Sequence, residues 1–184
     1  VQTCALPICQ EGLRGVSFGN VLVKQVAQDL GAALPRIRTF ATLSPIPGFV
    51  RWLKESVARD GKVSGELTAY LASLDGPEGE SLPLPGPGLR AEITQLCTDY
   101  LLRAKRGQAP LDPVERFHLA NGARLERLNW LGDTSAKGLS TSLGLTVNYV
   151  YRLSDIERNH EAYAKKYEIR SEEHTSELQS RLHL

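Results

Sequence analysis

The sequence predicts an α+β domain, because stretches with helical spacing and stretches that alternate like strands both occur in it. Its 184 residues are 41% hydrophobic and 23% charged, which suits a single globular domain, or one domain with a fragment of another. The clearest helix signal is the apolar spacing of residues 93–101. The clearest strand signal is the alternation of four residues, Leu145, Val147, Tyr149 and Tyr151.

Four elements are predicted in the first part of the chain. They are a helix over 21–30 that ends at Gly31, a short strand over 39–43, a helix over 49–57 that stops at Asp60-Gly61, and a helix over 67–74 that Ser64 caps. Residues 75–88 hold four Gly and four Pro, so we expect a loop or mobile linker there.

The second part of the chain is predicted to mix helices with strands. The helix that begins near residue 93 runs to about Arg106. Asp112-Pro113 starts the next helix, with Asp as the cap and Pro at the first helical position, and that helix ends near Asn121-Gly122. Strands over 125–131 and 145–151 follow. Ser154 and Glu157 have the spacing of a capping box, which predicts a last helix to about Tyr167.

Charge and composition exclude several classes of function. The formal net charge of +1 argues against a nucleic-acid partner. No run of about 18 apolar residues occurs, so we expect no membrane span. Three scattered Cys make neither a disulfide framework nor a paired-Cys zinc site, and no residue cluster has metal-ligand spacing. No targeting signal is recognised in the sequence, so the cytoplasm is the default expectation for localisation.

Both ends of the chain look foreign to the domain. One choice of codons for 170–178 has a reverse complement that encodes Val-Gln-Thr-Cys-Ala-Leu-Pro-Ile, the sequence of residues 1–8. Complementary strands of one short duplex, such as a sequencing adapter, explain this relation, and the chain contains no Met. We therefore predict that 1–8 and 170–184 are adapter translations around a partial domain over 9–169.

Three features of the remaining segment could carry chemistry. The Gly-rich stretch 12–19 before a helix is a candidate cradle for a phosphate, although an ordinary Gly-rich turn before a helix is the better interpretation of this signal alone. Ser44 stands before Pro45-Ile46-Pro47 and is either a helix cap, the better interpretation from chemistry alone, or a rigidly held binding group or nucleophile. His118, between Phe117 and Leu119, is either a core histidine, the better interpretation in isolation, or a general acid or base.

Several motifs together resemble one family in order across residues 10–151. They are Gly12-Leu-Arg-Gly-Val16 with Gly19, Leu43-Ser-Pro-Ile-Pro-Gly-Phe49 with Trp52-Leu53, Phe117-His-Leu119 with Asn121-Gly-Ala123, Leu128-Asn-Trp130, and Asn148-Tyr-Val-Tyr151. The sequence is identified by them as similar to the carboxy-terminal catalytic domain of malonyl-CoA decarboxylases. The resemblance implies an acetyltransferase-like (GNAT) mixed sheet flanked by helices. It also implies that this fold is incomplete on its amino-terminal side and that a missing helical domain forms a homo-oligomer.

The resemblance also implies the site residues. Ser44 would orient the malonyl carboxylate, or attack as a nucleophile, His118 would protonate the nascent carbanion, and Tyr151 would support His118 or the substrate. The pyrophosphate of CoA would lie on the loop formed by Arg14, Gly15, Val16, Ser17, Phe18, Gly19 and Asn20, in which Ser17 stands where the family has an acidic residue.

The implied reaction converts malonyl-CoA to acetyl-CoA and carbon dioxide, with no metal and no organic cofactor. Two alternatives stay open at this point. One is a CoA-dependent acyltransferase, which would share the pyrophosphate loop. The other is a non-catalytic CoA-binding module, because Ser17 departs from the family pattern.

Overall fold

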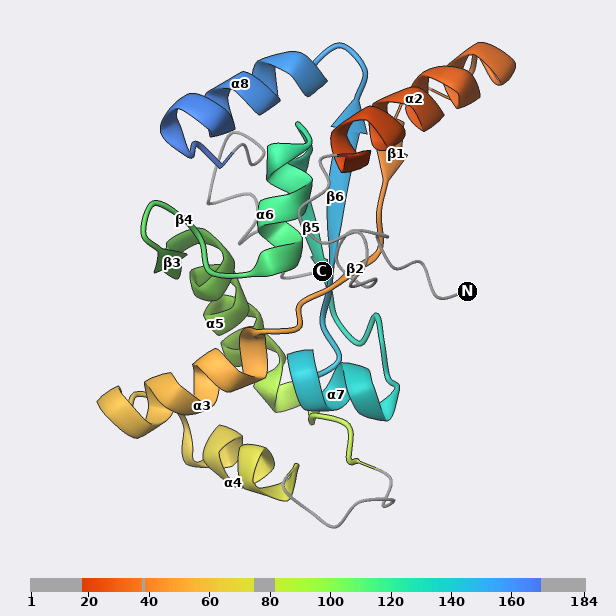
Figure 1. Cartoon of the computed structure of the whole chain (residues 1–184). Helices are drawn as coiled ribbons and strands as arrows, with labels where there is room; N and C mark the ends of the chain where they lie inside the picture. The colour runs from red at the N-terminus through yellow and green to blue at the C-terminus, as the bar shows by residue number, and fades with distance from the viewer. Residues whose placement is uncertain (1–17, 38, 75–81, 170–184) are drawn as a thin grey trace.

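The computed structural model describes three ranges of the chain, residues 18–37, 39–74 and 82–169. Figure 1 shows a narrow sheet along the middle of the molecule, with helices at both of its ends. α2 (Phe18–Ala33) and α8 (Ile156–Lys166) lie at one end, and α6 (Pro113–Ala120) lies beside the sheet. The other helices gather at the opposite end: α3 (Phe49–Asp60), α4 (Gly65–Ser73), the 3-10 turn η2 (Pro87–Leu89), α5 (Arg90–Arg103) and α7 (Ala136–Ser142). The predicted α+β class is confirmed.

The sheet is built around one strand, β6 (Thr146–Arg152), which pairs on both of its sides. β1 (Thr39–Ala41) and β2 (Ser44–Pro45) lie one after the other along one side, and β5 (Arg124–Asn129) lies along the other. Every described pair in this sheet is antiparallel, so the expectation of a mixed sheet is not met within the described residues.

β6 lies in the centre of the sheet and is more buried than its sequence predicts. Alternating apolar residues predict a strand with one buried face, and Val147, Tyr149 and Tyr151 do lie in the core. Thr146 and Val150, on the opposite face, are buried as well. β6 is therefore a core strand on both faces, and polar side chains on it need partners inside the protein.

α6 begins and ends where the sequence predicts. The Asp112 carboxylate accepts hydrogen bonds from the backbone N–H groups of Val114 (2.9 Å) and Glu115 (3.0 Å), which caps the helix. After the helix, Gly122 has a φ of +78°, and a Cβ at this position would lie 2.2 Å from the carbonyl oxygen of Ile156. A glycine is therefore required where the chain passes the start of α8.

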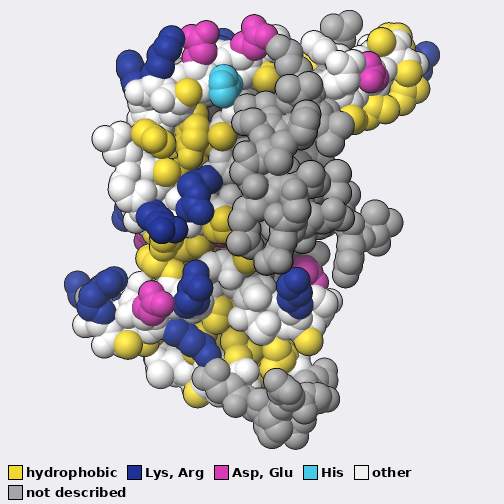
Figure 2. Space-filling view, in the orientation of Figure 1, with side chains coloured by type: hydrophobic (Ala, Val, Ile, Leu, Met, Phe, Trp, Pro, Cys, Tyr) yellow, Lys and Arg dark blue, Asp and Glu magenta, His cyan; other side chains and the backbone are white. Residues whose placement is uncertain are grey.

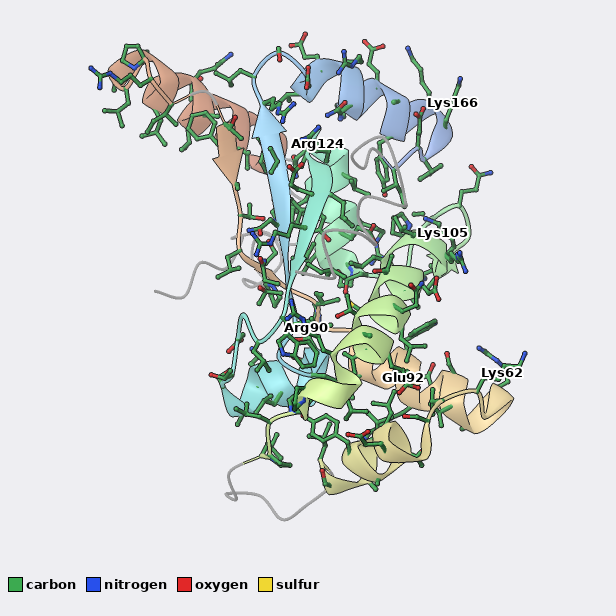
Figure 3. The ribbon with its side chains drawn as sticks, turned by 180° about the vertical axis from the view of Figure 1, so that it is seen from behind. Lys62, Arg90, Glu92, Lys105, Arg124 and Lys166 are labelled. Atoms are coloured by element: carbon green, nitrogen blue, oxygen red, sulfur yellow. The ribbon has the colours of Figure 1, made fainter. Side chains whose placement is uncertain are left out.

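The helices at the far end form one apolar cluster with the sheet. α3 ends at Gly61 in the left-handed conformation, and Ser64 caps α4, both as predicted. Glu92 on α5 accepts hydrogen bonds from the backbone N–H and the hydroxyl of Ser64, and thereby fastens α4 to α5 (Figure 3). The largest buried side chains in this cluster are Phe49, Leu53, Leu67, Ile93, Tyr100, Leu101 and Tyr149.

Two predicted helix ends are wrong. α2 continues past Gly31 to Ala33, and a Cβ added at that glycine would lie 3.4 Å from the side chain of Leu153. Val26 and Leu30 of α2 are exposed, at 46% and 42%. α5 ends at Arg103, not near residue 106, because a short hairpin follows: β3 (Lys105–Arg106) pairs with β4 (Ala109–Pro110).

Three further local signals were misleading or overlooked. Ser154 donates to its neighbour Asp155 and does not cap α8, so the predicted capping box is wrong. β5 stops at Asn129, short of the predicted residue 131, because Leu131 adopts a left-handed conformation with φ of 51°. α7 was not predicted, although Ser135 caps it through a 3.0 Å hydrogen bond from the N–H of Gly138.

The close approach of Gly122 to α8 predicts a large effect of a small substitution. We expect Gly122→Ala to lower the free energy of unfolding by about 3 kcal/mol, from conformational strain and displacement of the Ile156 carbonyl. Urea denaturation followed by circular dichroism measures this change.

Gly107→Ala is the matched control. Gly107 has a similar φ of +65° but no atom within 4 Å of an added Cβ, so it reports the conformational cost alone, about 1 kcal/mol. Equal losses for the two variants would contradict the proposed contact with α8.

Candidate active site

Ser44 and His118 are 74 residues apart in the sequence and touch in the structure. The hydroxyl of Ser44 on β2 lies 3.1 Å from Nε2 of His118 on α6, and both side chains are buried. The register of the sheet places Ser44 opposite Val147. The alternative interpretation of Ser44 as a helix cap is wrong, because Gly48 occupies the N-cap position of α3.

Tyr151 completes the contacts of the imidazole. Its hydroxyl lies 2.8 Å from Nδ1 of His118, and the side chain is only 2% exposed. Burial raises the pKa of the Tyr151 hydroxyl, so this group stays protonated at neutral pH. The three predicted catalytic residues therefore meet at one place, with a hydroxyl group at each nitrogen of the histidine ring.

The surroundings of His118 keep its ring neutral. The ring of Tyr149 stacks on it with centroids 4.5 Å apart and planes inclined by 21°, and Phe117 presents an edge to it at 5.1 Å. Burial lowers the pKa of His118 from its usual value to about 4, because the charged form would lose its hydration. At pH 7 this residue is a neutral imidazole with one N–H group, able to donate or accept a proton.

Thr42 belongs to the site, and the sequence interpretation missed it. The hydroxyl of Ser44 lies 2.9 Å from Oγ1 of Thr42, which in turn accepts a hydrogen bond from the backbone N–H of Tyr149 at 3.1 Å. The side chain of Asn148 donates to the backbone carbonyl of Thr42, and Asn129 donates to Asn148. The sequence did hold a signal for Thr42. It is two residues from Ser44, and residues two apart in an extended segment lie on the same side.

A second group of buried polar residues lies one helical turn before His118. Glu115 is fully buried, and neither of its carboxylate oxygens has a hydrogen-bond partner among the described residues. Burial, followed by the negative charge of Asp112, raises the pKa of Glu115 well above its usual value. The core thus favours the neutral form of Glu115, which its sequence context does not indicate.

The predicted pyrophosphate loop is only partly described. Arg14, Gly15, Val16 and Ser17 lie outside the described residues. Phe18, Gly19 and Asn20 form the first turn of α2, where backbone N–H groups have no partner within the helix. A helix start of this kind favours an anion.

Other candidates take ordinary structural positions. Cys97 is buried in the apolar cluster. His160 is exposed on α8, where Figure 2 shows a histidine at the surface, and its Nδ1 lies 2.6 Å from the carbonyl of Ala120. The part of the chain that the structure describes holds no cluster of three metal-ligating residues. Nor is any helix in that part both long and apolar enough to cross a membrane.

A family model described as the malonyl-CoA decarboxylase C-terminal domain matches residues 4–182. The chain belongs to this family. It is 35% identical to the mitochondrial malonyl-CoA decarboxylase of Anser anser anser and 33% identical to that of Mus musculus, over 192 residues in each case. These alignments cover 92% of this chain and 38% of either relative, so the chain spans less than two fifths of their length.

Solved structures agree with this assignment. The chain superposes on a malonyl-CoA decarboxylase from Rhodopseudomonas palustris with a TM-score of 0.77 and 44% identity, over 94% of this chain and 39% of that one. For the protein from Agrobacterium vitis the TM-score is 0.73 and the identity 42%, over 95% and 42% of the two chains. The family resemblance of the sequence motifs is thus confirmed. That 1–8 and 170–184 derive from an adapter stays a prediction, since both lie outside the described residues.

Burial of Glu115 predicts a pH-dependent stability. Its pKa is raised in the folded state, so the folded protein holds a proton that the unfolded chain releases above about pH 4.3. The free energy of unfolding therefore falls as the pH rises through this region. Glu115→Gln removes the titration, and we expect the variant to gain stability relative to the parent between pH 5 and pH 8, as measured by urea denaturation.

Glu55→Gln is the control for that comparison, since Glu55 is exposed on α3 and the same change is made there at the surface. It should show no such gain at higher pH. A difference between Glu115→Gln and the parent that stays constant across this pH range would contradict a neutral Glu115.

Proposed function

We propose that the protein to which this chain belongs decarboxylates malonyl-CoA, giving acetyl-CoA and carbon dioxide. The observation that carries the proposal is the contact between Ser44 and His118, supported on the far side of the ring by Tyr151. Membership of the family supports the identity of the substrate. No step of the proposed reaction uses a metal or an organic cofactor.

Ser44 has the position of a group that binds the malonyl carboxylate. Its hydroxyl is held at the junction of the sheet and α3, with Pro45 and Pro47 restricting the backbone behind it. In the proposed reaction the bond between the carboxylate carbon and the α-carbon breaks, and its electron pair stays on the α-carbon as an enolate. Donors held in place for the developing charge lower the barrier without having to reorient.

His118 has the position of the proton donor. A substrate bound at Ser44 lies next to Nε2 of His118, and a proton moves from that nitrogen to the α-carbon of the enolate. An enolate carbon is strongly basic, so a neutral imidazole suffices as the acid, and water then returns the proton. Tyr151 stabilises the ring while its charge changes. The start of α2 is the proposed location of the CoA pyrophosphate.

The proposal also concerns the ligands, the oligomer and the location in the cell. Malonyl-CoA and acetyl-CoA are the proposed ligands, and the homo-oligomer and the cytoplasmic location stay predictions. The curated relatives are named as mitochondrial proteins, so a mitochondrial location is the competing proposal. Fractionation of cells that express the complete protein would separate the two.

The complete reading frame around codons 10–169, recovered from source DNA, tests the activity. We expect release of carbon dioxide and acetyl-CoA from malonyl-CoA. Formation of an acylated amine from acetyl-CoA instead would favour an acyltransferase, and CoA binding without turnover would favour a non-catalytic module. Either result would overturn the proposal.

Removal of the proton donor gives the sharper test. His118→Gln is expected to lower kcat by about 100-fold to 10,000-fold with little change in KM, because Gln cannot transfer a proton. His160→Gln is the matched control, since His160 is exposed on α8, and it should retain full activity. Unchanged kcat in His118→Gln would exclude the acid role.

Substitution of Ser44 tests the binding role. Ser44→Ala should raise KM and lower kcat together, since the hydroxyl that orients the carboxylate is lost. Ser140→Ala, which alters an exposed serine on α7, is the control. A covalent acyl group on Ser44, detected by mass spectrometry of the protein during turnover, would instead identify a nucleophile.

The pKa of His118 predicts a flat pH profile. Because burial holds this pKa at about 4, the ring is neutral throughout the range from pH 6 to pH 8. We therefore expect kcat/KM to show no titration near pH 6.5, the ordinary value for histidine. A step near pH 6.5 that disappears in His118→Gln would contradict the buried environment.

A further inference from the structure

A continuous run of hydrogen bonds passes through both nitrogens of His118. It starts at the hydroxyl of Tyr151, 2.8 Å from Nδ1, and continues from Nε2 to the hydroxyl of Ser44 at 3.1 Å. Ser44 then contacts Oγ1 of Thr42 at 2.9 Å. A neutral imidazole carries a single N–H, so only two proton arrangements let Ser44, the hydroxyl in the middle of the run, both donate and accept within it.

In the first arrangement the proton of His118 is on Nε2. Tyr151 then donates to Nδ1, His118 donates to Ser44, and Ser44 donates to Thr42. In the second the proton is on Nδ1, and every bond is reversed, so that Thr42 donates to Ser44 and Ser44 donates to Nε2. Only the first arrangement places a transferable proton on the nitrogen that faces Ser44.

Each arrangement leaves the hydroxyl at one end of the run with a proton that has no acceptor within the run. The surroundings of that end hydroxyl decide which arrangement is favoured. In the second arrangement that proton is on Tyr151, which is 2% exposed and has no other partner among the described residues. In the first it is on Thr42, which is half-buried and not fully buried. A buried donor without an acceptor disfavours its arrangement by about 5-fold to 150-fold.

The position of Thr42 is held by the backbone and not by the run itself. The backbone N–H of Thr42 donates to the carbonyl of Tyr149 at 3.0 Å, and the N–H of Tyr149 donates to Oγ1 of Thr42 at 3.1 Å. Asn148 donates to the carbonyl of Thr42 from the neighbouring position of β6. Oγ1 of Thr42 is thus held in a fixed position, where it can accept a hydrogen bond from Ser44.

We propose that Thr42 is a positioning residue that accepts the proton of Ser44 before substrate binds and thereby keeps His118 as the Nε2–H tautomer; when the malonyl carboxylate binds, Ser44 turns this proton to it. This inference rests on the proposed function for its catalytic consequence, which is that the acid proton faces the substrate. Without the Thr42 hydroxyl, the proton of Ser44 has Nε2 as its remaining acceptor. His118 is then driven toward the tautomer whose Nε2 cannot donate.

Nuclear magnetic resonance of the chain labelled with ¹⁵N-histidine tests the tautomer directly. The chain has four His, and the signals of His118 are those missing from the His118→Gln spectrum. At pH 7 we expect Nε2 of His118 to be protonated and Nδ1 to be unprotonated. The reverse assignment in the parent chain would overturn the proposal, whatever the variants do.

Substitution of Thr42 then tests its role. Thr42→Val keeps a similar shape but lacks the hydroxyl, and we expect the Nε2–H to Nδ1–H ratio to fall by about tenfold or more. Thr42→Ser should restore the parent spectrum, since it retains the hydroxyl. Thr39→Val, the same change at an exposed position of β1, is the control. An unchanged tautomer ratio in a folded Thr42→Val would overturn the proposal.

Kinetics of the complete protein test the catalytic consequence. Thr42→Val should lower kcat by about tenfold with KM nearly unchanged, and Thr42→Ser should recover the rate. The tautomer is measured without substrate, so absence of decarboxylation would refute the proposed function while the spectra still decide the role of Thr42. If Thr42→Val does not fold, the parent and Thr42→Ser spectra still give a decision.

Discussion

Pairing of β6 on both sides is the constraint on which the site depends. One side of the strand fixes the register of the segment that carries Thr42 and Ser44, through the pairs that β1 and β2 make. The strand itself supplies Tyr149 and Tyr151, which contact the imidazole from its face and from its Nδ1 side. A shift of one residue would turn these side chains to the opposite face. The backbone ladder therefore sets the geometry of the chemistry.

Burial gives the site its chemical character. His118 stays neutral and Tyr151 stays protonated because both are removed from water, and hydrogen bonds satisfy both nitrogens of the ring. Glu115, one turn earlier on α6, is also buried but has no described partner for its carboxylate oxygens. The short helix α6 thus carries His118, whose ring nitrogens both have partners, and Glu115, whose unsatisfied carboxylate lowers the stability of the fold.

Errors in the sequence interpretation arose where local signals compete with packing. Gly31 follows an apolar helical pattern, which is typical of a helix end, yet it lies inside α2 with the side chain of Leu153 nearby. Ser154 and Glu157 have the spacing of a capping box, yet Ser154 hydrogen-bonds to its neighbour. Asp112 and Ser64 cap their helices as predicted, because the hydrogen bonds involved are local to the first turn.

The sequence by itself determined the features that depend on neighbouring residues or on long ordered motifs. These include the start of α6 at Pro113, the end of α3 at Gly61, the strand character of β6, and membership of the family through motifs that contain Ser44, His118 and Tyr151. Motifs identify such residues without placing them in contact.

Only the tertiary structure decided which of these residues meet. It brought Ser44 to His118 across 74 positions, added Thr42 to them, and buried Glu115 with no hydrogen-bond partner among the described residues. The physical reason is that contacts between distant segments depend on strand register and helix packing, which no local pattern encodes. Burial, and with it the neutral state of His118, is likewise a property of the assembled fold.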